Sequence, residues 1–212
     1  MKRIAGGWGG DCDMFERKLE LVSEAFVVCP LSETPENERL ISDFSAGNNA
    51  LGLEDFLKNH AQRFENSGEN RTYLVKDSVT GELACYFTLR SGLIPVPNNR
   101  VDGYLTTFSA IELAYFAVNE HYRKSKGTPL KIGFYVFDTF ILPIVRFAAQ
   151  IVGARFLYVY ALPRPKLISY YAREMGFRRL PDNLSEFLYA RVKPDSDDGC
   201  IFMFQPLFPD AS

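Results

Sequence analysis

Ile111-Glu112-Leu113-Ala114-Tyr115-Phe116-Ala117-Val118 is the stretch from which the fold of this chain can be predicted. Every residue in it except Glu112 is apolar or aromatic, which is typical of a strand buried on both faces. A polar, basic segment follows at 119–133, and from Phe134 to Val152 apolar residues recur every three or four positions, which predicts a helix. A strand, a cationic loop and a helix therefore follow one another.

The basic segment has the composition of an anion site. It contains Gly127 and Gly133 and four cationic residues, namely Arg123, Lys124, Lys126 and Lys131. At the start of a helix, backbone N–H groups and the helix dipole favour a bound anion such as a pyrophosphate. The alternative is an ordinary solvated surface loop.

Length and composition favour one domain with an extension. The chain has 212 residues, 47% of them hydrophobic, which is enough for one sizeable core. We expect residues 1–25 to form a flexible N-terminus with an extra helix from Met14 to Phe26, and residues 26–212 to form a single domain. The glycine-rich start around Trp8 follows no strand, so it fails the context test for a phosphate loop.

Charge and cysteine content exclude several functional classes. The net charge is −2, so no global field attracts nucleic acid, and any basic surface must be local. Four scattered cysteines without a CxxC pair, and only two histidines, make a metal site or a disulfide framework a poor fit. Asp138, Pro143 and Arg146 interrupt the apolar helix, and no signal peptide is recognisable, so we expect a cytoplasmic protein without a membrane span.

The remaining segments predict a mixed α/β (α+β) domain. A helix is expected at Leu53–Phe64, with His60 on its apolar face as a core or rim histidine rather than a catalytic one. Pro143 should interrupt the long helix. Further expectations are a first strand at Val27-Val28, a turn-rich segment at Pro35–Asn49, a hairpin of Thr72–Val75 with Leu83–Leu89, a loop at Pro95–Gly103, strands at Arg155–Leu162, Glu186–Val192 and Cys200–Gln205, and a helix at Lys166–Met175 ended by Gly176.

Three motifs in this order resemble those of the GNAT superfamily of N-acyltransferases. They are Glu112–Val118, the loop that closes on Lys131-Ile132-Gly133, and Tyr170–Phe177. Lys131 stands where the family loop has a glycine. The resemblance covers roughly residues 40–205 and implies a GNAT-like mixed, V-shaped sheet flanked by helices. A narrower likeness, carried by Phe44–Gly47, Leu53, Phe56-Leu57 and Arg71–Tyr73, is to bacterial toxins of this superfamily that acetylate aminoacyl-tRNA.

The resemblance implies an acetyl-CoA-dependent transfer of an acetyl group to a primary amine, by direct attack in a ternary complex and without a metal. Backbone N–H groups of Phe116, Ala117 and Val118 would polarise the thioester and pair with the pantetheine arm. The segment that follows would hold the pyrophosphate through Arg123, Lys124, Ser125, Lys126, Gly127, Lys131, Ile132 and Gly133.

Proton transfer is assigned to three candidates. Glu112 matches, position for position, the general-base glutamate of the histone-acetylating branch; the alternative is a carboxylate at a strand end. Tyr171 is the candidate acid for the leaving thiolate. It lies five residues before Gly176 rather than four, so Tyr170 is the alternate, and only one of two consecutive helical residues can face a cleft.

Two alternatives stay open beside the general amine acetyltransferase. One is the toxin of a toxin–antitoxin pair that acetylates aminoacyl-tRNA, although the net charge does not support tRNA binding. The other is a non-catalytic acyl-CoA-binding or interaction protein of GNAT fold. The sequence is also compatible with a homodimer, and it does not identify the acceptor amine.

Overall fold

The computed structural model describes residues 21–98, 104–127, 131–192 and 199–208. Within these ranges seven strands form one sheet in the order β1-β2-β3-β4-β5-β7-β6. The strands are β1 (Phe26–Pro30), β2 (Arg71–Asp77), β3 (Leu83–Pro97), β4 (Leu105–Val118), β5 (Phe156–Ala161), β6 (Arg178–Arg179) and β7 (Ile201–Pro206).

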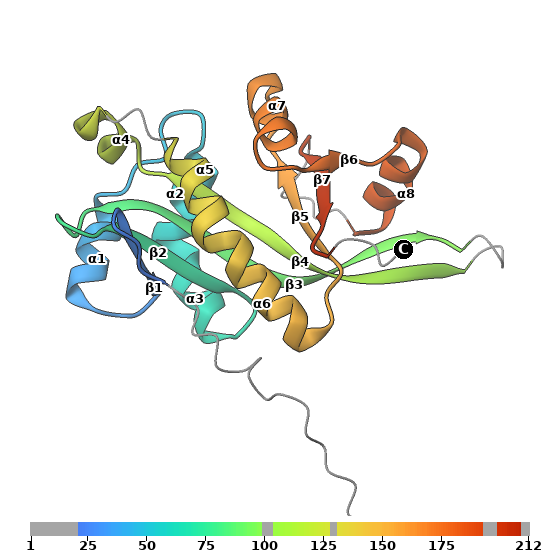
Figure 1. Ribbon diagram of the computed structural model, residues 1–212, viewed down its shortest axis with the longest axis horizontal. Helices are drawn as coiled ribbons and strands as arrows, with labels where there is room; N and C mark the ends of the chain where they lie inside the picture. The colour runs from blue at the N-terminus through green and yellow to red at the C-terminus, as the bar shows by residue number, and fades with distance from the viewer. Residues whose placement is uncertain (1–20, 99–103, 128–130, 193–198, 209–212) are drawn as a thin grey trace, which may run out of the picture.

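The sheet splits between its two central strands, β4 and β5. All other neighbours are antiparallel, whereas β4 and β5 are parallel and pair only from Ala110↔Phe156 to Glu112↔Tyr158. Beyond Glu112 the two strands separate, although β4 continues to Val118. The two strands diverge from this junction in Figure 1. The expected mixed, V-shaped sheet is therefore confirmed.

A bulge lies at the beginning of the split. The register between β3 and β4 shifts between Thr88, which pairs with Tyr115, and Leu89, which pairs with Leu113. Ala114 is the extra residue, and a bulge re-aims the side chains that follow it. After it, Phe116 packs with the core on one face of the sheet, while Tyr115 packs with the core on the other.

Helices cover both faces (Figure 1). One face carries the continuous helix Ile132–Val152, formed by α5 (Ile132–Val136), η3 (Phe137–Ile141) and α6 (Leu142–Val152). By length and composition it is the one described helix that could span a membrane, but its buried side chains, such as Val136 and Ile141, pack in the core. The other elements are α1 (Pro35–Ser42), α2 (Leu51–Asp55), η2 (Phe56–His60), α3 (Ala61–Asn66), α4 (Glu120–Lys126), α7 (Pro165–Arg173) and α8 (Asp182–Val192).

Both long helical segments contain a π turn, η2 and η3. The turn at Phe137–Ile141 lies just before Pro143, where the backbone of the helix departs from regular α geometry although the helix continues. The turn at Phe56–His60 rotates His60 away from the apolar face, because a π turn inserts an extra residue into the helical repeat. His60 is exposed, 3.2 Å from the Asp55 carboxylate, and its expected place on the apolar face is wrong.

Several other expectations are corrected. Pro35–Asn49 is not only turns, because Thr34 caps α1 by accepting a hydrogen bond from the Asn37 amide. Glu186–Val192 lies in α8 and is not a strand. Its aromatic and branched residues are common in strands, but here Leu188 packs into the core from a helix. The helix expected to reach Phe26 is wrong over residues 21–26, where Val22 bridges Val27. The remainder of that helix lies outside the described residues, and both it and the division of the chain at residue 26 stay predictions.

Two further corrections concern the elements around the split. Strand β3 continues to Pro97, so the loop expected from Pro95 is wrong over residues 95–97, and residues 99–103 of that loop lie outside the described part of the chain. The basic segment after β4 is not a simple loop, because α4 forms within it, capped by Asn119 at its start and by Gly127 (φ 54°) at its end. The signals for this short helix were a capping asparagine and a terminal glycine.

Candidate active site

The split in the sheet brings together three segments that are distant in the sequence. Gly133 lies in the first turn of the helix Ile132–Val152, and a Cβ placed on it would be 3.4 Å from the Tyr170 hydroxyl on α7. The same point would be 3.8 Å from Val118 and 3.9 Å from Phe116, both on the separated half of β4. The end of β4, a helix N-terminus and a tyrosine hydroxyl therefore meet at one place.

Tyr170 presents its hydroxyl group to this place. Burial is the main reason that the pKa of Tyr170 is raised, and the carboxylate of Glu174 raises it further, while an interaction with the Phe134 backbone acts in the opposite direction. Tyr170 therefore stays protonated at neutral pH, as a proton donor must.

Tyr171 points into the core instead. It is 6% exposed, and its ring meets that of Phe177 edge-on, with 5.4 Å between the centroids. Burial, with a smaller contribution from Tyr170, raises the pKa of its hydroxyl strongly. Of the two tyrosines named from the sequence, Tyr170 is the one that faces Gly133 and β4.

Glu112 occupies the last paired position before the split, and two side chains hold it with three hydrogen bonds. Arg90 on β3 donates to both carboxylate oxygens, from Nε at 2.8 Å and from Nη2 at 3.0 Å, and the Tyr158 hydroxyl on β5 donates at 2.8 Å. Glu112 is 3% exposed. Removing one partner of such a buried pair costs about 3–5 kcal/mol. This cluster therefore ties β3, β4 and β5 together where the sheet divides.

Gly92 makes room for this cluster. A Cβ on Gly92 would approach Cε1 of Tyr158 to 2.7 Å, closer than real side chains pack. Burial, followed by the negative charge of Glu112, raises the pKa of Tyr158, so this hydroxyl stays a donor to the carboxylate. Glu112 was predicted from the sequence, but Arg90, Gly92 and Tyr158 were not. They lie on other strands and reach Glu112 only through the pairing of β4 with β3 and β5.

The cationic side chains expected to hold a pyrophosphate are each paired with a carboxylate. Glu120 lies 3.6 Å from Arg123 and 3.2 Å from Lys124. Lys126 contacts Asp77 and Glu82, and Lys131 lies 3.1 Å from Glu174.

The structure divides the expected cofactor residues into two groups. Ile132 and Gly133 start the helix beside Phe116 and Val118, and Ala117 lies between those two on β4. Arg123, Lys124, Ser125, Lys126 and Gly127 belong to α4 and its cap. Residues 128–130, between the two groups, are outside the described part of the chain.

Exposed positive charge is concentrated in the segment of the chain that contains α7 and β6, which we call the basic strip. Five exposed cations fall within residues 164–179, against Glu174 as the only acid: Arg164, Lys166, Arg173, Arg178 and Arg179. The Arg164 guanidinium donates to the carbonyl oxygen of Asn49, which links α7 to the segment before α2. The basic strip was not predicted from the sequence, because the net charge of the whole chain is negative. A count of Lys and Arg against Asp and Glu over residues 164–179 would have revealed it.

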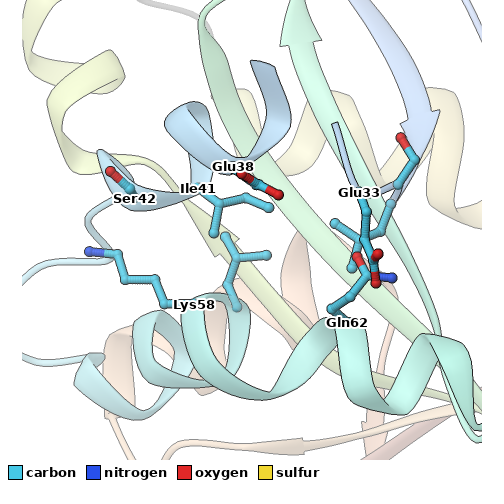
Figure 2. Close-up of a pocket in the computed structure, with 9 residues that line it drawn as sticks. Glu33, Glu38, Ile41, Ser42, Lys58 and Gln62 are labelled. Atoms are coloured by element: carbon cyan, nitrogen blue, oxygen red, sulfur yellow. The ribbon is translucent and has the colours of Figure 1, made fainter. Parts of the chain in front are cut away.

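A separate hollow of about 560 Å³ lies between α1 and the helix η2–α3. Figure 2 shows Ile41 and Ser42 on α1 facing Lys58 and Gln62 across it. Its lining includes none of the residues named for catalysis or cofactor binding. Among the described residues, no group of three or more His, Cys, Asp and Glu side chains is placed to hold a metal.

No protein-family model and no curated protein matches this chain by sequence. Solved structures with the same fold do match. A tyrosine-to-phenylalanine mutant of the toxin AtaT, bound to the C-terminus of the antitoxin AtaR, is 17% identical, with a TM-score of 0.59 over 86% of this chain and 92% of that one. The same kind of mutant of KacT is 20% identical, with a TM-score of 0.59 over 86% of this chain and 95% of that one.

A third similar structure is AtaT complexed with acetyl-methionyl-tRNAfMet, which is 18% identical, with a TM-score of 0.59 over 85% of this chain and 94% of that one. The chain therefore has the fold of these AtaT and KacT structures, and the fold expected from the sequence motifs is confirmed.

Proposed function

We propose that this protein is an acetyl-CoA-dependent N-acetyltransferase whose active site is the split between β4 and β5. One observation carries the proposal: the Tyr170 hydroxyl lies beside Gly133 at a helix N-terminus and beside the separated half of β4. This arrangement supplies, in one place, a helix N-terminus that can bind an anion, a strand edge whose backbone groups have no neighbouring strand, and a proton donor. Acetyl-CoA is among the ligands of a similar toxin structure, AtaT with AtaR.

The residues around the split fit the parts of acetyl-CoA. The backbone of Phe116, Ala117 and Val118 has no β5 partner beyond Glu112, so it can pair with the amides of the pantetheine arm and polarise the thioester. Ile132 and Gly133 offer amides to the pyrophosphate. The ion pairs of Arg123, Lys124, Lys126 and Lys131 would have to open for those side chains to join them.

Tyr170 is the proposed acid. When the amine displaces the thiolate, the Tyr170 hydroxyl gives it a proton, since a thiol with a pKa near 8.5 is a better leaving group once protonated. Tyr171 stays a candidate only by sequence position, because its ring is committed to the core.

Glu112 as the general base also stays a prediction. The three hydrogen bonds to its two oxygens equally support a role in holding β3, β4 and β5 together at the split. A water molecule can deprotonate an α-amine with less help than a lysine requires, since the α-amine pKa is about 7.7–8.0.

For the acceptor we propose the α-amine of an aminoacyl-tRNA, which would make the protein a cytoplasmic toxin controlled by an antitoxin. AtaT was captured with acetyl-methionyl-tRNAfMet in one structure and with the C-terminus of the antitoxin AtaR in another. The basic strip on α7 and β6 adds local positive charge beside the helix that carries Tyr170. Lys and Arg on such a face neutralise phosphates, even where the net charge of the protein is negative.

The direct test is acetyl transfer from acetyl-CoA to methionyl-tRNA, compared between Tyr170→Phe and Tyr171→Phe. We expect Tyr170→Phe to lower kcat by about 10²–10⁴-fold, the usual contribution of a general acid, without changing acetyl-CoA affinity. Tyr171→Phe should lower the free energy of unfolding and leave kcat nearly unchanged. A Tyr171→Phe protein that is folded but inactive, beside an active Tyr170→Phe protein, would reverse the assignment.

The acceptor is tested separately with Arg178→Glu and Arg179→Glu. Each should raise KM for methionyl-tRNA, reduce the dependence of binding on salt concentration by about one unit of the log–log slope, and leave the acetylation of a small amine unchanged. Arg63→Glu, on α3, is the matched control for reversing one exposed charge. Equal effects at Arg63 and Arg178 would show that the strip does not contact the acceptor.

The alternative function is a protein that binds acyl-CoA without turnover. The paired cations of the basic segment favour it, because they are not free to neutralise a pyrophosphate. Acetyl-CoA binding without thiol release across a panel of amines and aminoacyl-tRNAs would support this alternative.

A further inference from the structure

The two faces of the sheet carry different groups at the split. Phe116 and Val118 lie on the face where Gly133 and Tyr170 meet, which is the proposed cofactor side. Tyr115 packs on the opposite face, with the core formed by η2 and α3. With the cofactor on the first face, the opposite face is left for the acceptor amine, and we call it the acceptor face.

A row of β3 side chains lies on the acceptor face. Successive residues of a strand point to opposite faces, so alternate residues of β3 share this one: Tyr86, Thr88, Arg90, Gly92 and Ile94. Tyr86 is buried against η2 at one end of the row, and Ile94 is buried in the core that α8 covers at the other. Arg90 lies between these two covers, and its side chain is 33% exposed. Arg90 is therefore accessible from the acceptor face.

The guanidinium of Arg90 has donors that the protein does not use. Its Nε and Nη2 donate to the two oxygens of Glu112, at 2.8 Å and 3.0 Å. A guanidinium has five N–H donors, so this pairing leaves both hydrogens of Nη1 and one of Nη2. Among the described residues, no acceptor is bonded to these three hydrogens, which we call the free edge of Arg90. Glu112, itself buried and bonded by Tyr158, fixes the orientation of this edge.

We propose that the free edge of Arg90 binds the carbonyl oxygen next to the acceptor amine, and so selects amines that have a carbonyl group on the adjacent carbon. An aminoacyl ester has such an oxygen, whereas a lysine side chain or a polyamine does not. Arg90 pairs with Glu112 across β3 and β4, and Glu112 is the last residue of β4 that pairs with β5. The free edge therefore lies beside the point where β4 becomes available to the thioester. This assignment rests on the proposed acetyltransferase function.

The charge of this pair favours a neutral carbonyl over an anion. Glu112 balances the charge of Arg90, so the pair has no net charge that would attract a phosphate or a free carboxylate. A hydrogen bond from a charged donor to a neutral oxygen still contributes about ten- to a hundredfold in binding. The group expected on the free edge is therefore an ester or amide carbonyl.

The experiment compares the acetylation of two small amines, methioninamide and 3-(methylthio)propylamine, which differ only by the carbonyl group. The measured quantity is the ratio of their kcat/KM values at one pH. The amines also differ in pKa, but that difference is the same for every variant and cancels when variants are compared. Arg90→Lys should lower the ratio at least tenfold, because an ammonium group engaged by Glu112 offers no second edge to the acceptor.

Tyr158→Phe is the matched control for damage to the cluster. It removes one hydrogen bond to Glu112 but leaves the free edge of Arg90, so it should lower the melting temperature and keep the wild-type ratio. A second test serves if Arg90→Lys does not fold. Arg90→Gln combined with Glu112→Gln leaves no unpaired buried charge, and its ratio should be at least tenfold below that of Glu112→Gln alone. Circular dichroism verifies that each variant is folded.

The outcomes separate this assignment from the proposed function, because acetylation of methionyl-tRNA is measured in parallel. A wild-type protein inactive on methionyl-tRNA and on both small amines overturns the two together. Activity on methionyl-tRNA with neither small amine acetylated overturns the assignment of Arg90 alone. So does an unchanged ratio in a folded Arg90→Lys or double variant, or a fall in Tyr158→Phe as large as in Arg90→Lys.

Discussion

At the scale of one residue, the cluster of Glu112, Arg90 and Tyr158 can form because Gly92 has no side chain that would collide with the Tyr158 ring. We predict that Gly92→Ala displaces Tyr158, since the new Cβ would lie 2.7 Å from Cε1 and 2.8 Å from Cζ of that ring. The free energy of unfolding should fall by about 1–3 kcal/mol, the usual cost of overpacking. Gly52→Ala is the control, because a Cβ there meets nothing within 4 Å. Urea denaturation of both variants measures the difference, and equal stability would contradict the prediction.

Tyr170 gives a prediction about pH at the same scale. If it protonates the thiolate, the loss of rate in Tyr170→Phe should be largest at neutral pH. The loss should shrink as the pH passes the thiol pKa near 8.5, because the thiolate then leaves without a proton. Burial raises the pKa of Tyr170, so the wild-type hydroxyl remains protonated over this range. Single-turnover rates from pH 6.5 to 9.5 test this, and a constant ratio of the two rates would remove Tyr170 from proton transfer.

Residue identities in the sequence indicated only part of the site. The pair Tyr170-Tyr171 could be named from its position before Gly176, but the choice between them depends on how α7 is rotated against the core. Arg90 could not be associated with Glu112, because their contact depends on the pairing of β3 with β4.

At the scale of an element, the turn between β2 and β3 depends on a carboxylate. Asp77 accepts hydrogen bonds from the Tyr122 hydroxyl at 2.6 Å and from the Val79 and Thr80 amides at 2.9 and 2.8 Å. Burial alone would raise the pKa of Asp77, but the bonds from Tyr122, Thr80 and Val79, together with nearby Lys126, lower it well below its ordinary value. The turn is therefore most stable when Asp77 is ionised.

The prediction from this turn concerns acid. A lowered pKa means that the unfolded chain takes up the proton first, so the stabilisation is complete above the unfolded pKa near 3.9 and is lost as the pH falls below it. Asp77→Asn should lower the free energy of unfolding by about 2 kcal/mol at pH 7, with a smaller deficit at pH 3. Exposed Asp138→Asn is the control. A deficit that is the same at pH 7 and pH 3 would contradict the prediction.

Helices and strands were predicted best where the apolar pattern extends over many residues. The helix from Phe134 to Val152, strand β5 and the inner parts of β3 and β4 were expected from their apolar patterns, whereas the outer parts of β3 and β4 were not. Helices α1 and α4 were missed because they are short and polar, so their capping residues were a stronger signal than their periodicity. Helix α8 was taken for a strand because over seven residues aromatic and branched side chains fit either structure.

At the scale of the whole molecule, ligand binding should be visible as stability. Acetyl-CoA at 100 times its dissociation constant should add about 2.7 kcal/mol to the free energy of unfolding. For a chain of this size, that corresponds to a rise in melting temperature of roughly 5–10 °C. Differential scanning fluorimetry measures it, with adenosine as the control for the nucleoside part alone. A folded protein that shows no shift at millimolar acetyl-CoA would contradict the assignment of the split as a cofactor site.

The overall architecture was predictable because the order of motifs along the chain constrains the topology more than any single residue does. The split itself was not derivable from composition. It depends on where β4 and β5 stop pairing, and that position is set by the bulge at Ala114 and by the cluster around Glu112.

The π turn at Phe137–Ile141 has a consequence for aligning this protein with proteins of similar fold. A π turn behaves as one residue inserted into an α-helix, so the residues after it are out of phase with those before it. Val136 before the turn and Ile144 after it are both buried although they are eight residues apart, a spacing that would place them about 80° apart around a regular α-helix. An alignment of this helix with one that lacks the turn therefore needs a gap of one residue between positions 137 and 141. Without that gap, inward-facing and outward-facing positions would be matched, and the residues shared by the two cores would go unrecognised.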